Sequence, residues 1–575
     1  MKKIKTLIAM IIVIAMFGSL VVGCSKDTKD TSDKDAVVTE GADKEEAVDT
    51  TDSEVKEVKQ FTMFNAVQGT EIPDDNRVMK AITDITGAWA KTTWLTGQTA
   101  DERIGVMIAG GEYPDFLTGA TGTAALLEAG ALIAIDEYWD AYPNIKNYLS
   151  EADWNKVRAE DGHIYLMPQF GIIQGKDTAT YHWDEAFWIQ IDVLIWDKFP
   201  IIKTMDQYFD LISRYKAANP QTADGQDTVG FSMSSEDWRY FGIENPPLFL
   251  SGYPNDGACI VDPATETAID FNTIPKAKDY YKKINEAFNA GLVHPETFTM
   301  SYDQYIALLS TGRVLGTLDQ RWNFNTANDA LITAGQAGKT YVPLPITYSE
   351  DIKDRWHSPS ALDVSNGLAI TTSCKDIEGA MKFVNDLLSP EVMTLRAWGQ
   401  EGTDYMVGDD GVFYKTEEQR ANYDNLDFVT DNLSKYDYFP HFEGQLADGL
   451  NAQDPKNQPN EFYERLSDVE KQLLDGYGYK TFLEFLSSDE PNQPWYPMWS
   501  YTNNWTNDTD YGLARTKITE LKHEWLPKAM MAPTAEFDAI WDDYQATYKA
   551  DVDVDVYLEA LTTEIQRRSA VAKGE

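Results

Sequence analysis

The chain has 575 residues, of which 43% are hydrophobic and 12% aromatic, so it is long enough for two or more domains with buried cores. Acidic residues outnumber basic residues by 93 to 49, and the formal net charge is −44. A field of this sign repels nucleic acid and anionic lipid, which argues against a nucleic-acid partner and favours a neutral ligand, although a local Arg can still hold an anion.

The first 24 residues have the pattern of a secretory signal. A basic head carrying Lys2, Lys3 and Lys5 precedes an apolar run over residues 7–20, which ends in Val21-Val22-Gly23-Cys24. The last four residues resemble a bacterial lipobox, in which cleavage before the cysteine leaves a thiol that carries lipid. We therefore predict a signal peptide over 1–23 and a lipid on Cys24. An ordinary signal peptide with an incidental cysteine, or an uncleaved anchor, is the alternative.

The segment after Cys24 has the composition of a tether. Residues 25–59 contain no aromatic residue, twelve Asp or Glu and six Lys. Such a segment cannot bury enough apolar surface to offset the entropy of ordering it. We predict that residues 24–59 form a lipid-anchored, flexible, acidic tether on the extracellular face of the cell membrane.

The rest of the chain alternates between strand and helix patterns. Residues 60–67 alternate as in a strand, and strands are also predicted over 114–117, 313–318 and 367–371. Helices are predicted after the capping boxes Thr99/Glu102, Thr204/Gln207 and Ser301/Gln304, after Pro275 and Asp376, and around Trp541. This alternation indicates an α/β fold with mainly parallel sheets.

A glycine-rich turn follows one of these predicted strands. Residues 118–122 (Thr-Gly-Ala-Thr-Gly) connect the strand over 114–117 to a predicted helix over 124–129. Ligands of open α/β sheets bind where strands end, so Thr118 and Thr121 are candidate ligand contacts.

The motifs of catalysis and metal binding are missing from the sequence. No two of the six His residues have the His-Glu-x-x-His spacing, and there is no Cys-x-x-Cys or Gly-x-Ser-x-Gly. Residues 551–562 begin like a calcium loop but lack the required Gly and the closing Glu. We predict no cofactor, no metal and no enzymatic activity, although a carboxylate pair for glycoside hydrolysis stays open among so many acids.

Aromatic residues with polar neighbours occur in clusters instead. A sugar ring has an apolar C–H face that stacks on a flat aromatic ring, and hydroxyls that need polar partners at its edge. Core packing is the alternative for each cluster. Trp322 is the favoured contact because it follows a strand in a predicted polar turn. The candidate ligand-binding residues from these clusters are Trp183, Trp238, Arg239, Asp319, Arg321, Trp322 and Asn323.

Several segments, in this order along the chain, carry a resemblance to one family: residues 109–116, 161–168, 188–192, 289–296, 311–314 and 398–405. Together they resemble the long branch of the family 1 extracellular solute-binding lipoproteins of carbohydrate ABC importers in Gram-positive bacteria. The resemblance adds Trp398 to the candidate contacts. It implies a two-lobed periplasmic-binding-protein-like fold of the class II type, with a ligand cleft between the lobes and hinge strands near 168–175 and 365–368. Some relatives carry a calcium loop that would correspond to residues 219–228.

The implied lobes consist of residues 60–171 with 367–438, and of residues 175–366 with 439–575. The implied function is a monomeric lipoprotein that captures an extracellular carbohydrate, most simply an oligosaccharide, and delivers it to the permease subunits of an ABC importer. The alternatives are a surface-anchored carbohydrate-active enzyme and a sugar sensor on the same fold.

Overall fold

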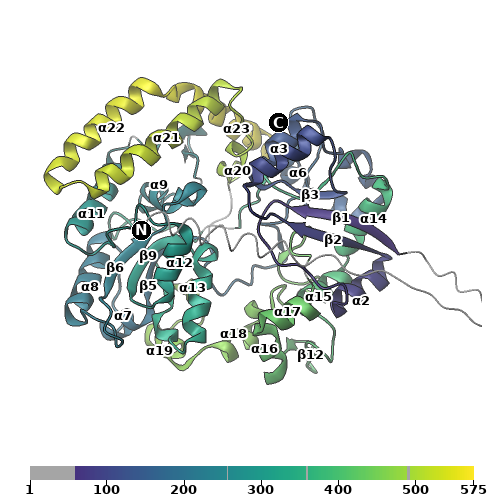
Figure 1. Cartoon of the computed structure of the whole chain (residues 1–575), viewed down its shortest axis with the longest axis horizontal. Coiled ribbons are helices and arrows are strands. Elements are labelled where there is room, and N and C mark those ends of the chain that lie inside the picture. Colours follow the sequence, from purple (N-terminus) through teal and green to yellow (C-terminus); the bar gives the residue numbers. More distant parts are fainter. Residues whose placement is uncertain are drawn as a thin grey trace, which may run out of the picture. The chain divides into compact units, whose positions relative to one another are not determined.

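A computed structural model of the protein describes residues 58–255, 257–272, 274–357, 360–434, 436–487 and 493–574 (Figure 1). The predicted signal peptide, Cys24 and nearly all of the predicted tether lie outside the described residues. Within those ranges, no helix combines the length and the apolar character needed to cross a bilayer.

The first sheet joins three N-terminal strands with one from much later in the chain. Its order is β11-β3-β1-β2, in which β1 pairs in parallel with β2 and β3, and β11 pairs antiparallel with β3. Alternate residues of β1 serve two cores, because neighbouring side chains of a strand point to opposite faces. The strands are β1 (Lys59–Asn65), β2 (Ala88–Trp94), β3 (Phe116–Thr118) and β11 (Ala369–Ile370).

The second sheet has the order β10-β5-β9-β6, and one strand is reversed in it. β9 pairs in parallel with β6, whereas β5 is antiparallel to both β9 and β10. The prediction of mainly parallel sheets is therefore wrong here. The physical reason is that β5 pairs with β9 and β10 from a distant part of the chain, so the local alternation of strand and helix does not determine its direction. The strands are β5 (Glu185–Gln190), β6 (Val229–Met233), β9 (Val314–Gln320) and β10 (Tyr341–Leu344).

Helices pack around both sheets (Figure 1). Around the first sheet they are α2 (Arg77–Thr86), α3 (Ala100–Gly110), α4 (Thr123–Glu128), α5 (Pro143–Lys146), α6 (Glu151–Val157), α14 (Ile377–Leu387), α15 (Pro390–Trp398), α16 (Glu417–Asp424) and α17 (Leu426–Asn432). Around the second they are α7 (Ile191–Trp196), α8 (Met205–Ala218), α9 (Phe241–Glu244), α10 (Pro246–Leu250), α11 (Pro275–Asn289), α12 (Tyr302–Ser310) and α13 (Arg321–Thr333). The last part of the chain adds α18 (Pro459–Arg465), α19 (Asp468–Tyr477), α20 (Trp499–Thr502), α21 (Asp510–Met531), α22 (Phe537–Asp551) and α23 (Val554–Lys573).

The predicted helix starts are confirmed where a local hydrogen bond determines them. All three capping boxes form, with the hydroxyl of the first residue accepting from the backbone N–H three residues on and the acid or amide bonding back. These pairs satisfy backbone N–H groups that have no partner inside the helix. Pro390, which follows the end of α14, opens α15, because proline fits the first helical turn.

The buried residues form separate cores. The largest is built from residues between Ala186 and Trp356 and between Phe462 and Ile565, and it contains Cys259. A second, on one face of the first sheet, contains Phe61, Phe383 and Cys374. A third covers the other face of that sheet through α3 and α4. The two cysteines thus lie in different cores.

Three chain segments run next to one another at the second core, which includes Met167, Ile172 and Leu368. The backbones of Met167 and Leu368 exchange two hydrogen bonds, each 2.9 Å from N to O. Beside them, β4 (Ile173–Gln174) pairs in parallel with β14 (Glu443–Gly444), so a third segment joins the two crossings expected from the sequence. Two further hairpins are β7 (Ile260–Asp262) with β8 (Thr267–Ile269) and β12 (Met406–Val407) with β13 (Phe413–Tyr414).

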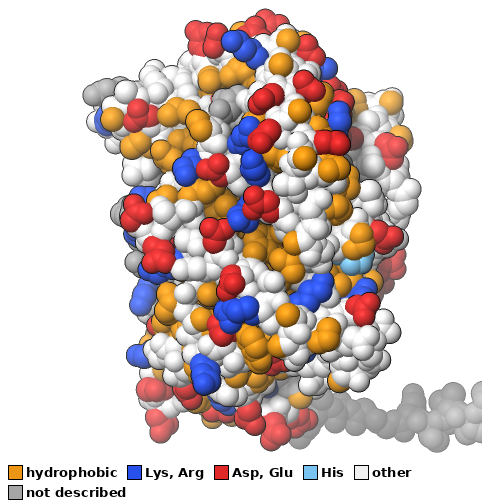
Figure 2. All heavy atoms as spheres, turned by 90° about the vertical axis from the view of Figure 1, so that its left-hand side faces the viewer, with side chains coloured by type: hydrophobic (Ala, Val, Ile, Leu, Met, Phe, Trp, Pro, Cys, Tyr) orange, Lys and Arg blue, Asp and Glu red, His pale blue; other side chains and the backbone are white. Residues whose placement is uncertain are grey.

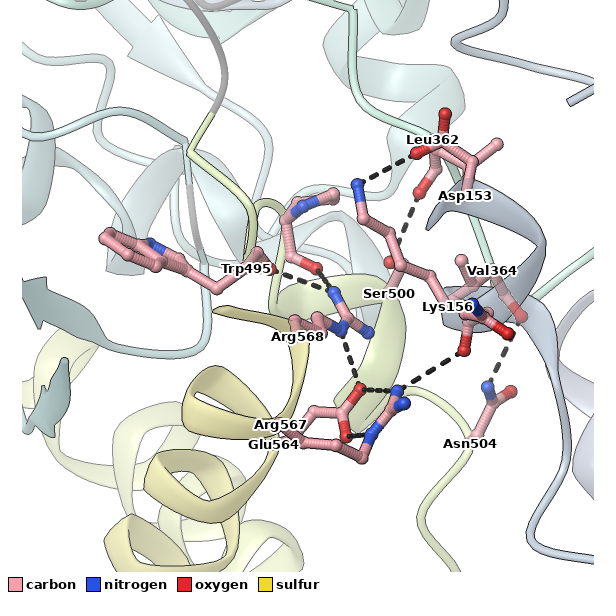
Figure 3. A network of polar contacts seen from close by, with 12 residues as sticks. Asp153, Lys156, Leu362, Val364, Trp495, Ser500, Asn504, Glu564, Arg567 and Arg568 are labelled. Carbon is pink, nitrogen blue, oxygen red and sulfur yellow. Dashed lines mark hydrogen bonds and ion pairs between the residues drawn. The ribbon is translucent and has the colours of Figure 1, made fainter. Parts of the chain in front are cut away.

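A buried charge network holds the C-terminal helix α23. Figure 3 shows the guanidinium groups of Arg567 and Arg568 directed at the Glu564 carboxylate. The Arg568 Nε atom lies 2.6 Å from Glu564, and its Nη1 donates to the carbonyls of Trp495 and Pro497 at 2.9 and 3.0 Å. Arg568 therefore ties α23 to the segment that precedes α20.

Charges of both signs alternate on the surface formed by α8, α11 and α22. Lys278 and Lys282 of α11 pair with Asp538 of α22, and Arg214 of α8 pairs with Asp197. Figure 2 shows Lys and Arg side chains interspersed with Asp and Glu on this side of the molecule. Basic side chains of this surface thus have acidic partners, and the acidic excess of the chain remains.

Candidate binding site

Trp322 lies in the first turn of α13. β9 runs on to Gln320 and α13 begins at Arg321, so the predicted polar turn around Trp322 is wrong. The reason is that Phe324 and Leu331 lie on the same face of the helix and are both buried, so the helix extends back to the residues before Phe324. Trp322 itself is 44% exposed, since it points away from that face.

Trp322 stacks on Trp238, which comes from a 3₁₀ turn over residues 237–240. Their ring centroids are 5.8 Å apart and their planes differ by 6°, and Phe241 lies 5.8 Å from Trp322. Trp238 is 51% exposed. We call Trp238, Phe241 and Trp322 the tryptophan platform. It is an exposed apolar surface of flat rings, which is rare on a monomeric protein unless something binds there.

Trp183 and Arg321 continue the site beyond the platform. Trp183 is exposed, and its backbone carbonyl accepts a hydrogen bond from the backbone N–H of Trp322 at 3.3 Å. The Arg321 guanidinium carbon lies 5.5 Å from the Trp183 ring and 4.4 Å from the Tyr181 ring. Burial lowers the pKa of Arg321, and its Nε has no hydrogen-bond partner among the described residues.

Arg239 is held between two rings next to the platform. Its guanidinium carbon lies 4.5 Å from the Trp238 ring and 4.0 Å from the Tyr302 ring. Its Nε donates to Asn323 Oδ1 at 3.1 Å. Tyr302 in turn donates its hydroxyl hydrogen to the Asn323 carbonyl at 2.6 Å. These contacts fix the plane of the guanidinium group.

Asp319 and Asn323 hold Arg239 in place through a chain of hydrogen bonds. Both are buried, and Asn323 Nδ2 lies 3.1 Å from each Asp319 oxygen. Asp319 also accepts from the Tyr305 hydroxyl at 2.8 Å and from the Gln320 N–H at 2.7 Å. Burial raises the pKa of Asp319 to about 7, although these hydrogen bonds and the charge of Arg239 oppose the rise. Asp319 and Asn323 thus orient Arg239 in this conformation, and both side chains are themselves buried.

The structure does not bring the remaining candidates to the platform. Thr118 is buried at the end of β3, and its hydroxyl donates to Asn65 Oδ1 at 2.8 Å. Thr121 donates to Asp101 at 2.6 Å. Trp398 is fully buried at the end of α15, where its indole N–H donates to the Ala452 carbonyl at 2.9 Å and its ring contacts Tyr405. Trp398 therefore presents no ring surface to a ligand in this conformation.

Sequence reasoning missed Tyr302 and Tyr305 as parts of the site. Both lie on α12, and Tyr305 is on the buried face of that helix. Their contacts with Arg239 and Asp319 join α12 to the 3₁₀ turn over residues 237–240 and to β9. No local pattern carries that information.

Residues 219–228, which would correspond to the calcium loop of some relatives, form a turn that is closed by hydrogen bonds within the protein. Thr222 donates to the Gln226 carbonyl at 3.1 Å, and Thr228 donates to the Asn219 carbonyl at 2.6 Å. In the part of the chain that the structure describes, no three His, Cys, Asp or Glu side chains are grouped so that they could hold a metal ion.

Residues 90–394 match the family model of the bacterial extracellular solute-binding proteins. The chain belongs to this family. This confirms the family predicted from the sequence, whose members are binding components of transporters and not enzymes.

Two curated relatives and one solved structure show the same relationship. The fructooligosaccharide ABC transporter substrate-binding protein FusA of Streptococcus pneumoniae is 23% identical over 367 residues, which is 61% of this chain and 64% of FusA. Lipoprotein LipO of Bacillus subtilis is 21% identical over 365 residues, which is 61% of this chain and 68% of LipO. The chain thus spans about two thirds of the length of these relatives.

The solved structure of S. pneumoniae FusA in complex with kestose has a TM-score of 0.62 and 16% identity, and the match covers 89% of this chain and 100% of that chain. This likeness shows the fold, the two-lobed architecture of solute-binding proteins, and confirms the predicted fold class.

Proposed function

We propose that this protein captures an extracellular oligosaccharide and delivers it to the permease subunits of an ABC importer. The observation that carries the proposal is the tryptophan platform with Arg239 fixed at its edge. The printed name of FusA, a fructooligosaccharide-binding transporter component, supports the same substrate class.

The platform has the chemistry that a sugar needs. The exposed parts of the stacked Trp238 and Trp322 indoles offer apolar surface to the C–H face of a pyranose or furanose ring. The Nη atoms of Arg239 offer donors to oxygens at the edge of that ring. Trp183, beside Trp322, extends the aromatic surface, which suits a ligand of more than one sugar unit.

The fold suits capture between two lobes. We assign residues 60–171 with 367–438 to the first lobe, and residues 175–366 with 439–575, which include the platform, to the second. The loop over residues 119–122 of the first lobe would face the platform. A ligand that contacts both lobes stabilises the closed state because those contacts are missing in the open state.

The predicted lipid on Cys24 would keep the protein, as a monomer, on the outer face of the membrane beside its permease. LipO, a relative, is named a lipoprotein, which supports this part of the proposal. The protein would then act by binding alone. Incubation of the purified protein with oligosaccharides, followed by analysis for cleaved products, separates this proposal from a surface-anchored carbohydrate-active enzyme.

Thermal unfolding of residues 24–575 against a panel of plant and microbial oligosaccharides tests binding. A ligand present at a hundred times its dissociation constant stabilises the folded state by about 2.7 kcal/mol. We expect one sugar class to raise the Tm, and Trp322→Ala to abolish the shift. Trp196→Ala is the matched control, because Trp196 is 41% exposed but packs beside Tyr215, away from the platform. No Tm shift with any sugar would refute the proposal.

A further inference from the structure

We propose that the oligosaccharide is acidic, and that Arg239 selects it by binding the carboxylate of a uronic acid unit whose ring lies on the tryptophan platform. The inference rests on the proposed function and narrows its substrate class.

Arg239 is oriented before any ligand arrives. The guanidinium carbon lies 4.5 Å from the Trp238 ring and 4.0 Å from the Tyr302 ring, and Asn323 accepts a hydrogen bond from the Nε atom. Asn323 is itself fixed by Asp319. The two Nη atoms, which carry four of the five N–H donors, have no hydrogen-bond acceptor among the described residues.

The positive charge of Arg239 is not matched by an ion pair. In the described part of the chain, no carboxylate lies within ion-pair distance of Arg239 or of Arg321 on the other side of Trp322. Other arginines of this chain are paired, such as Arg77 with Asp404 and Arg420 with Glu461. Two unpaired guanidinium groups beside one exposed aromatic surface, in a chain with 93 acidic residues, indicate that the missing anion comes from the ligand.

A uronic acid suits the tryptophan platform and Arg239 at once. Its ring presents the same C–H face to the indoles as a neutral sugar does. Its planar carboxylate has two oxygens spaced to accept both Nη donors of one arginine, and such charge-assisted pairs are roughly twice as strong as neutral hydrogen bonds. A neutral sugar would offer only hydroxyls to a partly desolvated cation.

Matched ligand pairs test the proposal by titration calorimetry on residues 24–575. Oligogalacturonides, oligoguluronates, oligomannuronates and glucuronate-bearing xylo-oligosaccharides are each compared with their carboxyl-reduced forms, which keep the rings and linkages but lose the charge. We expect at least one acidic ligand to bind tenfold or more tightly than its reduced partner. Arg239→Gln should remove that preference, because it should weaken binding of the acidic ligand at least tenfold more than binding of the reduced form. Arg214→Gln, which breaks a surface pair away from the platform, should leave it unchanged.

The outcomes distinguish a failure of the acidic-ligand proposal from a failure of the proposed function. Equal affinity for the acidic and reduced forms, or binding of neutral oligosaccharides only, overturns the acidic ligand and leaves the proposed function standing. Binding of no saccharide overturns both. If Arg239→Gln fails to fold, as judged by circular dichroism, Arg239→Lys takes its place. It keeps the charge but loses the paired donors, and an undiminished preference in that variant overturns the role of Arg239.

Discussion

Arg567 and Arg568 provide a direct test of how burial determines the value of a salt bridge. Both pair with Glu564 on the same helix, each with a closest nitrogen-to-oxygen distance of 2.6 Å. The Arg568 side chain is 1% exposed, whereas the Arg567 side chain is 45% exposed. Replacing each in turn with Met, which has a similar length, therefore removes the same charge from a buried site and from an exposed site.

The expected loss for Arg568→Met follows from its partners. The carbonyls of Trp495 and Pro497 would lose their donor in a buried site, at about 1–3 kcal/mol each. Glu564 would lose one of its two counter-charges but keep Arg567. Loss of the buried Nη2, which has no partner in the described part of the chain, offsets part of this cost. We expect the free energy of unfolding to fall by about 3–5 kcal/mol, the usual range for breaking a buried pair.

Arg567→Met should lower the free energy of unfolding by about 1 kcal/mol or less, because an exposed pair is stabilised little by the attraction of its charges. Urea unfolding of residues 24–575, followed by far-ultraviolet circular dichroism, measures both variants. Equal losses for the two variants, or a loss below about 1 kcal/mol for Arg568→Met, would refute the reasoning that burial sets the difference.

Three further substitutions test other parts of the structure by the same unfolding assay. The pKa of Asp319, ordinarily 3.8, is about 7 in the folded state, so the folded protein holds a proton that the unfolded chain releases. The stabilisation from that proton is lost as pH rises from about 4 to 7, and the stability difference between wild type and Asp319→Asn should fall by up to about 1.4 kcal/mol per pH unit there; a constant difference would contradict the raised pKa. Gly316→Ala should lower stability by about 1–3 kcal/mol, because a methyl group on β9 would overlap the buried Tyr208 hydroxyl, and a neutral effect would contradict that packing. Ser467→Ala should lower it by about 1 kcal/mol through loss of the cap of α19, whereas Ser467→Thr should retain most of it.

The sequence alone determined the features that depend on neighbouring residues. Capping boxes such as Thr99 with Glu102 form within one turn of chain, so their spacing was sufficient to locate the helix starts. The ordered segments also identified the family, and with it the two-lobed fold. The aromatic clusters around Trp238 and Trp322 were visible as candidates for the same reason, because each is continuous in sequence.

The tertiary structure decided which candidates act together. Trp238 and Trp322 stack on each other. Arg239 and Asn323, which directly follow them in the chain, are hydrogen-bonded although they are 84 residues apart. No local pattern distinguishes a Trp that packs on another ring at the surface from Trp398, which is enclosed in a core. The reversed strand β5 and the burial of Asp319 have the same origin, since both depend on which distant segments pack beside them, and burial of a side chain is a property of those neighbours and not of its own sequence.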